Sequence, residues 1–134
     1  MNEATAPANP TMTLATEFAE MLKSGEFKGA MEKFYADDAV QIEAMEDPSG
    51  TFPRVTEGKE ALLKSSDWWE QNHEVHGYEQ DGPYPHDDKF IMIMRIDVTA
   101  KAGPMEGQRM DMHEACHYTV KDGKISKVEF YYAC

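Results

Sequence analysis

Two glutamates stand where their carboxyl groups could transfer protons inside a protein. Glu114 belongs to an alternating run whose other even-numbered members are mostly apolar: Met110, Met112, Cys116, Tyr118 and Val120. If this parity is the core face of a strand, Glu114 points into an apolar interior. Burial raises the pKa of a carboxyl group toward the range useful for general acid–base catalysis. A glutamate at a wet rim, or one satisfied by a tyrosine hydroxyl, is the structural alternative.

Glu43 is the second candidate, and its orientation depends on strand register. It alternates with Val40, Ile42 and Ala44, which would place it on the solvent face, but a bulge would reverse that face. Two carboxylates in one pocket push their pKa values apart, so that an acid and a base coexist at neutral pH. We therefore take Glu114 and Glu43 as the candidate catalytic residues. Asp47 is a further candidate, although its place before Pro48 is typical of a turn-forming residue.

Aromatic and methionine side chains could line a pocket for a hydrophobic ligand. Trp68 and Trp69 are neighbours late on a predicted helix, so one could pack in the core while the other lines the pocket mouth. Methionine suits an adaptable lining, and ordinary core filling is the alternative. Tyr118 and Tyr132 could offer hydroxyl donors. The candidate binding residues are Phe18, Trp68, Trp69, Met92, Met94, Met112, Cys116, Tyr118, Phe130 and Tyr132.

The histidine and cysteine spacing argues against a metal or a thiol nucleophile. On a strand, His113 and His117 lie roughly 13 Å apart, too far to share one ion. Cys116 lacks a base beside it, because His117 points to the opposite face, so a core thiol is expected. The sequence contains no glycine-rich phosphate loop or dinucleotide fingerprint. We expect no metal site and no cofactor.

Helical periodicity is confined to the first half of the chain. An amphipathic stripe begins near Thr13, a good N-cap, and a second short stripe runs from Phe27 to about Asp38. A strand is predicted from Ala39, and a third helix over about Lys59 to Asn72. Alternating runs then predict four strands, separated at Asp81-Gly82-Pro83, Ala102-Gly103-Pro104 and Asp122-Gly123.

This order, ααβαββββ, predicts an α+β domain with an antiparallel sheet. The length of 134 residues fits one domain, which we place at residues 12–134, after a mobile tail at residues 1–11 that contains Pro7 and Pro10. The composition is 41% hydrophobic, as expected of a globular protein.

The charge balance disfavours polyanionic partners. A formal net charge of −12 repels nucleic-acid backbones and anionic lipid surfaces, so we expect neither nucleic acid nor membrane as a partner. The residues from Met1 to Pro10 show no export signal, and Cys116 and Cys134 are the only cysteines. A cytoplasmic protein with reduced thiols is expected.

Three segments carry a family resemblance. They are Phe34-Tyr35-Ala36-Asp37-Asp38-Ala39-Val40, Glu57-Gly58-Lys59-Glu60-Ala61-Leu62 and Tyr118-Thr119-Val120-Lys121-Asp122-Gly123-Lys124-Ile125. In this order and spacing, the chain resembles the SnoaL-like branch of the nuclear-transport-factor-2-like superfamily over roughly residues 12–132. The resemblance implies a cone: a strongly bent antiparallel sheet wraps a long helix and leaves a pocket at the wide end. It also implies a homodimer packed through the outer sheet face.

The same resemblance allows site residues to be compared one by one. Glu43 falls where ketosteroid isomerases carry their catalytic base, but Phe18 and Cys116 replace the two oxyanion donors. Phe130 falls near the acidic residue of the polyketide cyclases and cannot transfer protons. These departures disfavour both activities in their usual form.

The sequence therefore predicts a pocket protein for a small, mostly apolar molecule that carries a carbonyl or hydroxyl group. Its carboxylates would support a cofactor-independent isomerase, cyclase, dehydratase or hydrolase. The alternative is a non-catalytic ligand-binding or assembly module of the same fold.

Overall fold

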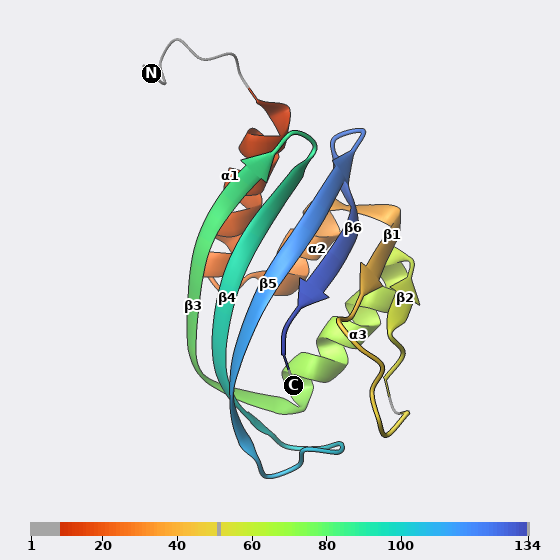
Figure 1. The fold of residues 1–134 in the computed structure, drawn as a ribbon, viewed down its shortest axis with the longest axis vertical. Coiled ribbons are helices and arrows are strands. Elements are labelled where there is room, and N and C mark those ends of the chain that lie inside the picture. The colour runs from red at the N-terminus through yellow and green to blue at the C-terminus, as the bar shows by residue number, and fades with distance from the viewer. Residues whose placement is uncertain (1–8, 51, 134) are drawn as a thin grey trace.

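A curled six-stranded sheet with three helices on one side makes up the described residues, 9–50 and 52–133, of the computed structural model (Figure 1). The helices are α1 (Pro10–Lys23), α2 (Phe27–Phe34) and α3 (Lys59–Gln71). The strands are β1 (Tyr35–Ile42), β2 (Val55–Glu57), β3 (His73–His86), β4 (Lys89–Ala100), β5 (Arg109–Lys121) and β6 (Lys124–Tyr131). None of the described helices has the length and apolar character needed to cross a bilayer.

The strands are ordered β2-β1-β6-β5-β4-β3 across the sheet. All neighbours are antiparallel except β1 and β6, which run parallel. The predicted α+β class is confirmed, and two details differ from the prediction: the sheet is mixed, and the short β2 adds an element before α3. A three-residue strand carries too little alternation to be recognised from sequence.

The first helix begins earlier than predicted. Asn9, not Thr13, is the N-cap: its Oδ1 accepts hydrogen bonds from the backbone N–H groups of Thr11, at 3.0 Å, and Met12, at 3.4 Å. Pro10 then occupies the first turn, where its missing N–H costs nothing. The remainder of the predicted tail, residues 1–8, lies outside the described residues. The second helix ends at Phe34, four residues before Asp38.

The predicted turn at Asp81-Gly82-Pro83 is wrong, because these residues lie inside β3. The register of β3 against β4 shifts between Asp81 and Tyr84, so the turn-forming residues produce an irregularity within a strand of 14 residues. The chain turns instead at Asp87, whose φ of 56° is left-handed. The predicted β5–β6 hairpin at Asp122-Gly123 is confirmed.

An aromatic cluster around Phe18 fills the space between α1 and the sheet. The Phe18 ring lies 5.0 Å from that of Tyr118, 6.1 Å from that of Phe90 and 6.0 Å from that of Phe34. Tyr118 also stacks on Phe90 at 4.8 Å. These side chains are almost completely buried, so this part of the cone is a packed core.

Candidate functional site

The odd-numbered residues of β1 face the interior. Gln41 pairs with the buried Val128 on β6, and Ala39 is itself buried. Neighbouring residues on paired strands point to the same face, so Glu43, two residues beyond Gln41, is directed inward as well. The β1–β6 register shifts between Tyr35 and Val40. The sequence left both faces open for Glu43, and the structure places it on the interior face, with the same parity as Tyr35 and Ala39.

Glu43 has a hydrogen-bond donor on each carboxylate oxygen. The Tyr132 hydroxyl donates to Oε2 at 2.9 Å, and Gln41 Nε2 donates to Oε1 at 3.3 Å. β1 and β6 run parallel, so their C-terminal ends lie side by side at the same end of the sheet. Glu43 and Tyr132 are the first residues beyond those C-terminal ends. Burial raises the pKa of Glu43, while the hydrogen bonds from Tyr132 and Gln41 oppose that rise.

Glu114 lies on the same interior face, from β5. It pairs with the buried Met94 on β4, which confirms the inward parity predicted from its alternating run. Ala115 pairs with Tyr131, so the next residues, Glu114 and Tyr132, come beside one another. Burial, and then the negative charge of Glu43, raise the pKa of Glu114 to about 7. No residue within 9–50 or 52–133 donates a hydrogen bond to its carboxyl group.

The two carboxyl groups therefore differ in their surroundings. Glu43 is stabilised as an anion by two donors, whereas Glu114 is desolvated beside that anion and holds its proton up to about neutral pH. With Glu43 ionised and Glu114 protonated, one site contains both a base and an acid. The arrangement can remove a proton from one atom of a ligand and donate a hydrogen bond or a proton to another.

The predicted lining residues divide into two groups. Four of them, Phe18, Met92, Cys116 and Tyr118, are at most 3% exposed and belong to the packed core, and Met94 is nearly as buried. Met112 and Phe130 are half-buried. Phe130 pairs with Cys116 across β5 and β6, and Met112 precedes Glu114 by two positions on the same face. A ligand bound at the two carboxyl groups would therefore contact Met112 and Phe130 without displacing any side chain of the packed core.

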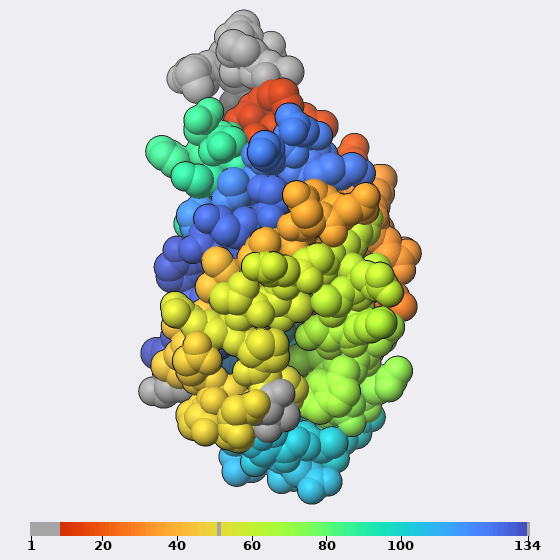
Figure 2. All heavy atoms as spheres, turned by 90° about the vertical axis from the view of Figure 1, so that its right-hand side faces the viewer, coloured from red at the N-terminus to blue at the C-terminus, as the bar shows by residue number. Residues whose placement is uncertain are grey.

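An aromatic group lies at the C-terminal end of α3. The Trp68 ring is 5.0 Å from that of Phe52, and the Trp69 ring stacks on His73 at 4.4 Å. His73 Nδ1 lies 2.7 Å from the backbone oxygen of Trp69. Neither tryptophan is fully buried, and Trp68 is 37% exposed. Figure 2 shows a narrow recess between the segment after β1 and α3, above the β4–β5 connection.

Sequence reasoning missed Gln41, Phe52 and His73. Gln41 shares the parity of Glu43, so a correct assignment of the β1 face would have identified it. Phe52 lies in an irregular segment, where no periodicity indicates which way a side chain points. His73 begins β3 at a helix-to-strand junction, where neither periodicity indicates the direction of a side chain, and that junction brings its ring onto Trp69.

The remaining chemistry-bearing residues do not join this site. Burial raises the pKa of the Cys116 thiol, so it is not a thiolate at neutral pH. Cys134 lies outside the described residues. His113 is on the outer sheet face, 3.4 Å from Asp111. Within residues 9–50 and 52–133, no three His, Cys, Asp or Glu side chains are grouped as metal ligands.

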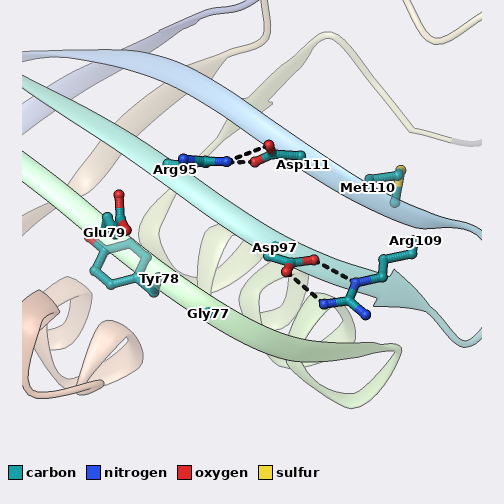
Figure 3. Close-up of a pocket in the computed structure, with 8 residues that line it drawn as sticks. All are labelled: Gly77, Tyr78, Glu79, Arg95, Asp97, Arg109, Met110 and Asp111. Atoms are coloured by element: carbon teal, nitrogen blue, oxygen red, sulfur yellow. Dashed lines mark hydrogen bonds and ion pairs between the residues drawn. The ribbon is translucent and has the colours of Figure 1, made fainter.

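The outer sheet face has a shallow groove of about 550 Å³ (Figure 3). Two bidentate ion pairs lie along it, Arg95 with Asp111 at 2.8 Å and Arg109 with Asp97 at 2.9 Å. Each charged group is neutralised by its partner on the neighbouring strand, so these pairs leave little net charge for a ligand. We do not assign the groove as the catalytic site.

The fold and this site define an α+β domain with a carboxylate pair on the interior face of a curled sheet. The model of the SnoaL-like domain matches residues 10–132, which is nearly the whole chain. The chain belongs to this SnoaL-like family, and the resemblance inferred from sequence is confirmed. No protein of curated function is detectably similar to it.

Solved structures agree with this assignment. A protein of Mesorhizobium loti, described as a proposed SnoaL-like polyketide cyclase and also as a carbohydrate phosphatase, is 47% identical. The match covers 90% of this chain and 97% of that protein, with a TM-score of 0.82. A proposed isomerase of Bacillus subtilis is 16% identical over 99% and 90% of the two chains, with a TM-score of 0.69. An NTF2-like protein of Burkholderia pseudomallei, of unknown function, is 10% identical over 94% and 92%, with a TM-score of 0.72. The last two show a shared fold.

Proposed function

We propose that this chain is a cofactor-independent enzyme that transfers protons on a small, mostly apolar ligand bearing a carbonyl group. The observation that carries the proposal is the unequal pair: Glu43 with a donor on each oxygen, and Glu114 desolvated beside it with a pKa of about 7. Perturbed pKa values in a pair of neighbouring carboxyl groups are characteristic of acid–base sites.

In the proposed reaction, the Glu43 carboxylate removes a proton from a carbon adjacent to the carbonyl group. The electron pair of that C–H bond moves into the carbonyl group, and the Glu114 carboxylic acid donates its proton to the developing oxyanion. Where the ligand carries a C=C bond next to the carbon that lost its proton, the resulting dienol takes the proton back from Glu43 at the far end of that bond, which is isomerisation. Alternatively, the enol carbon attacks a second carbonyl group, whose oxygen takes the proton from Glu43, which is cyclisation. In each case the enol O–H returns its proton to Glu114 as the carbonyl group reforms. Both outcomes restore the two carboxyl groups to their starting states.

A carbonyl ligand is favoured over a phosphorylated one. The ionised Glu43 would repel a phosphate group, and the Arg54 guanidinium, whose Nε donates to the backbone oxygen of Glu43, belongs to an exposed side chain. The half-buried Met112 and Phe130 beside the carboxylates suit an apolar ligand body.

Proton exchange tests this proposal without knowledge of the natural substrate. β-Tetralone, an apolar bicyclic ketone, is incubated with the protein in D₂O, and deuterium incorporation next to the carbonyl group is followed by NMR. We expect catalysed exchange, reduced about 100-fold in Glu43→Gln, as removal of a general base requires. Glu106→Gln, at an exposed loop position, is the matched control. Ketone binding with no catalysed exchange would reject the enzyme in favour of a non-catalytic ligand-binding module.

The pH profile of exchange gives an independent readout. Glu43 must be ionised, so the rate falls as pH drops through its pKa, which burial raises above the ordinary value of 4.5. Glu114 must be protonated, so the rate also falls as pH rises through about 7. A rate that increases steadily above pH 7 would contradict the assigned role of Glu114.

We also propose that a second copy of the chain packs on the outer sheet face. Four exposed apolar or aromatic residues lie there, on β3, β4 and β6: Tyr84, Ile91, Ile93 and Tyr131. The Arg95–Asp111 pair flanks them with both charge signs, which suits a self-complementary two-fold contact. Sedimentation should give the mass of a dimer for the wild type and of a monomer for Ile93→Lys. A monomeric wild type would reject this interface.

A further inference from the structure

We propose that Tyr132 and Gln41 are positioning residues that decide which carboxyl group of the pair acts as the base. They hold the two oxygens of Glu43, so the negative charge of the pair stays there and the proton stays on Glu114. This inference rests on the proposed function, and it assigns a role to two residues that touch the base rather than the ligand.

The geometry of the Glu43 carboxylate is the first support. Its Oε2 lies 2.9 Å from the Tyr132 hydroxyl and its Oε1 lies 3.3 Å from Gln41 Nε2, so each oxygen has its own donor. The donors come from different strands: Gln41 is on β1, and Tyr132 follows β6. Two fixed donors restrict rotation of the carboxylate and keep its remaining lone pairs directed at the site.

The contrast with Glu114 is the second support. Both carboxyl groups are half-buried on the same interior face, but no donor from residues 9–50 or 52–133 is directed at Glu114. Desolvation alone would disfavour charge on either group, and only Glu43 receives hydrogen bonds that compensate for it. Burial raises the pKa of both groups, and the two donors keep the charge on Glu43 by opposing that rise there alone.

Few other charged or titratable groups face Glu43 in the described structure. Glu114 and Cys116 reach it from β5, and Tyr132 from the end of β6. Arg54 donates to the backbone oxygen of Glu43, and its side chain is exposed. Among residues 9–50 and 52–133, no cation is hydrogen-bonded to the carboxylate oxygens of Glu43. The Tyr132 hydroxyl, which has the shorter of the two contacts, is therefore the dominant stabiliser of the charge.

Tyr132→Phe removes the hydroxyl while it keeps the ring. The chain offers a matched control at the adjacent residue: Tyr131 is 52% exposed on the outer face, with its hydroxyl 3.4 Å from His117 Nδ1. Tyr131→Phe removes the same atom from the other side of the sheet. Gln41→Met is a second, independent variant that removes the longer hydrogen bond with little change in side-chain length.

Carbon-13 NMR titration of the glutamate side-chain carboxyls measures each group directly. Loss of the Tyr132 hydroxyl should make Glu43 bind its proton about tenfold more tightly, which is the size expected for one hydrogen bond to a charged group. Gln41→Met should give a smaller change in the same direction, and Tyr131→Phe no change. In β-tetralone exchange, the acid side of the pH profile should move to higher pH in Tyr132→Phe.

The titration overturns the inference if Glu43 binds its proton equally tightly in the wild type, Tyr132→Phe and Gln41→Met. It is equally overturned if Tyr131→Phe produces the same change as Tyr132→Phe, because the effect would then be general to the C-terminal segment. The titration does not depend on turnover. A protein in which Tyr132→Phe changes the proton affinity of Glu43 but no exchange is catalysed would reject the proposed function and retain the positioning role.

Discussion

Replacing Glu114 with glutamine should make the protein more stable at alkaline pH. The folded protein raises the pKa of Glu114 from 4.5 to about 7, so it binds this proton more tightly than the unfolded chain does. The resulting stabilisation is complete below about pH 4.5 and is lost as pH rises through about 7. The difference between these two pKa values corresponds to about 3 kcal/mol of folding free energy, at 1.36 kcal/mol per pKa unit. Partial exposure of the side chain reduces the expected value to about 2 kcal/mol.

Urea unfolding at about pH 5 and about pH 8 measures this difference. Glutamine cannot ionise, so Glu114→Gln does not lose stability as the wild type does when the pH rises. The free energy of unfolding of the variant minus that of the wild type should therefore be about 2 kcal/mol greater at about pH 8 than at about pH 5. Glu106→Gln removes an equal charge at an exposed position and should show almost no such change. If Glu114→Gln shifts stability by the same amount at both pH values, Glu114 is not desolvated and the acid assigned to the site does not exist.

Three further substitutions test the fold. Asn9→Ala removes the α1 cap and should cost about 1 kcal/mol in thermal unfolding; no loss would mean that the helix begins elsewhere. Phe18→Ala should cost about 3–5 kcal/mol in urea unfolding, because its ring packs against four others, and a smaller cost would indicate a loosely filled interior. Arg95→Ala should leave the stability of the monomer in urea unfolding almost unchanged, since both members of its ion pair are half-exposed; a clear loss would mean that the pair is desolvated.

Most of the fold could be predicted because its signals are local. Helical spacing identified α1 and α3, and alternation identified β4, β5 and β6. The inward position of Glu114 followed from the same alternation, since β5 keeps regular pairing with β4 along its length. Asp81-Gly82-Pro83 misled the prediction because the residues that form turns also form strand irregularities, and only pairing with β4 distinguishes the two.

The site itself required the tertiary structure. The inward face of β1 is set by its pairing with β6, a strand that lies more than 80 residues away in sequence, and the local alternation of Val40, Ile42 and Ala44 does not record that pairing. Tyr132 was predicted to bind a ligand, but the parallel course of β1 and β6 brings its hydroxyl onto Glu43.

The sequence by itself determined which groups are available: two glutamates, their apolar neighbours and the family to which the chain belongs. The tertiary structure decided which groups meet and how they differ. Proton affinity depends on desolvation and on hydrogen bonds between segments distant in sequence, and these exist only when β1, β5 and β6 lie side by side.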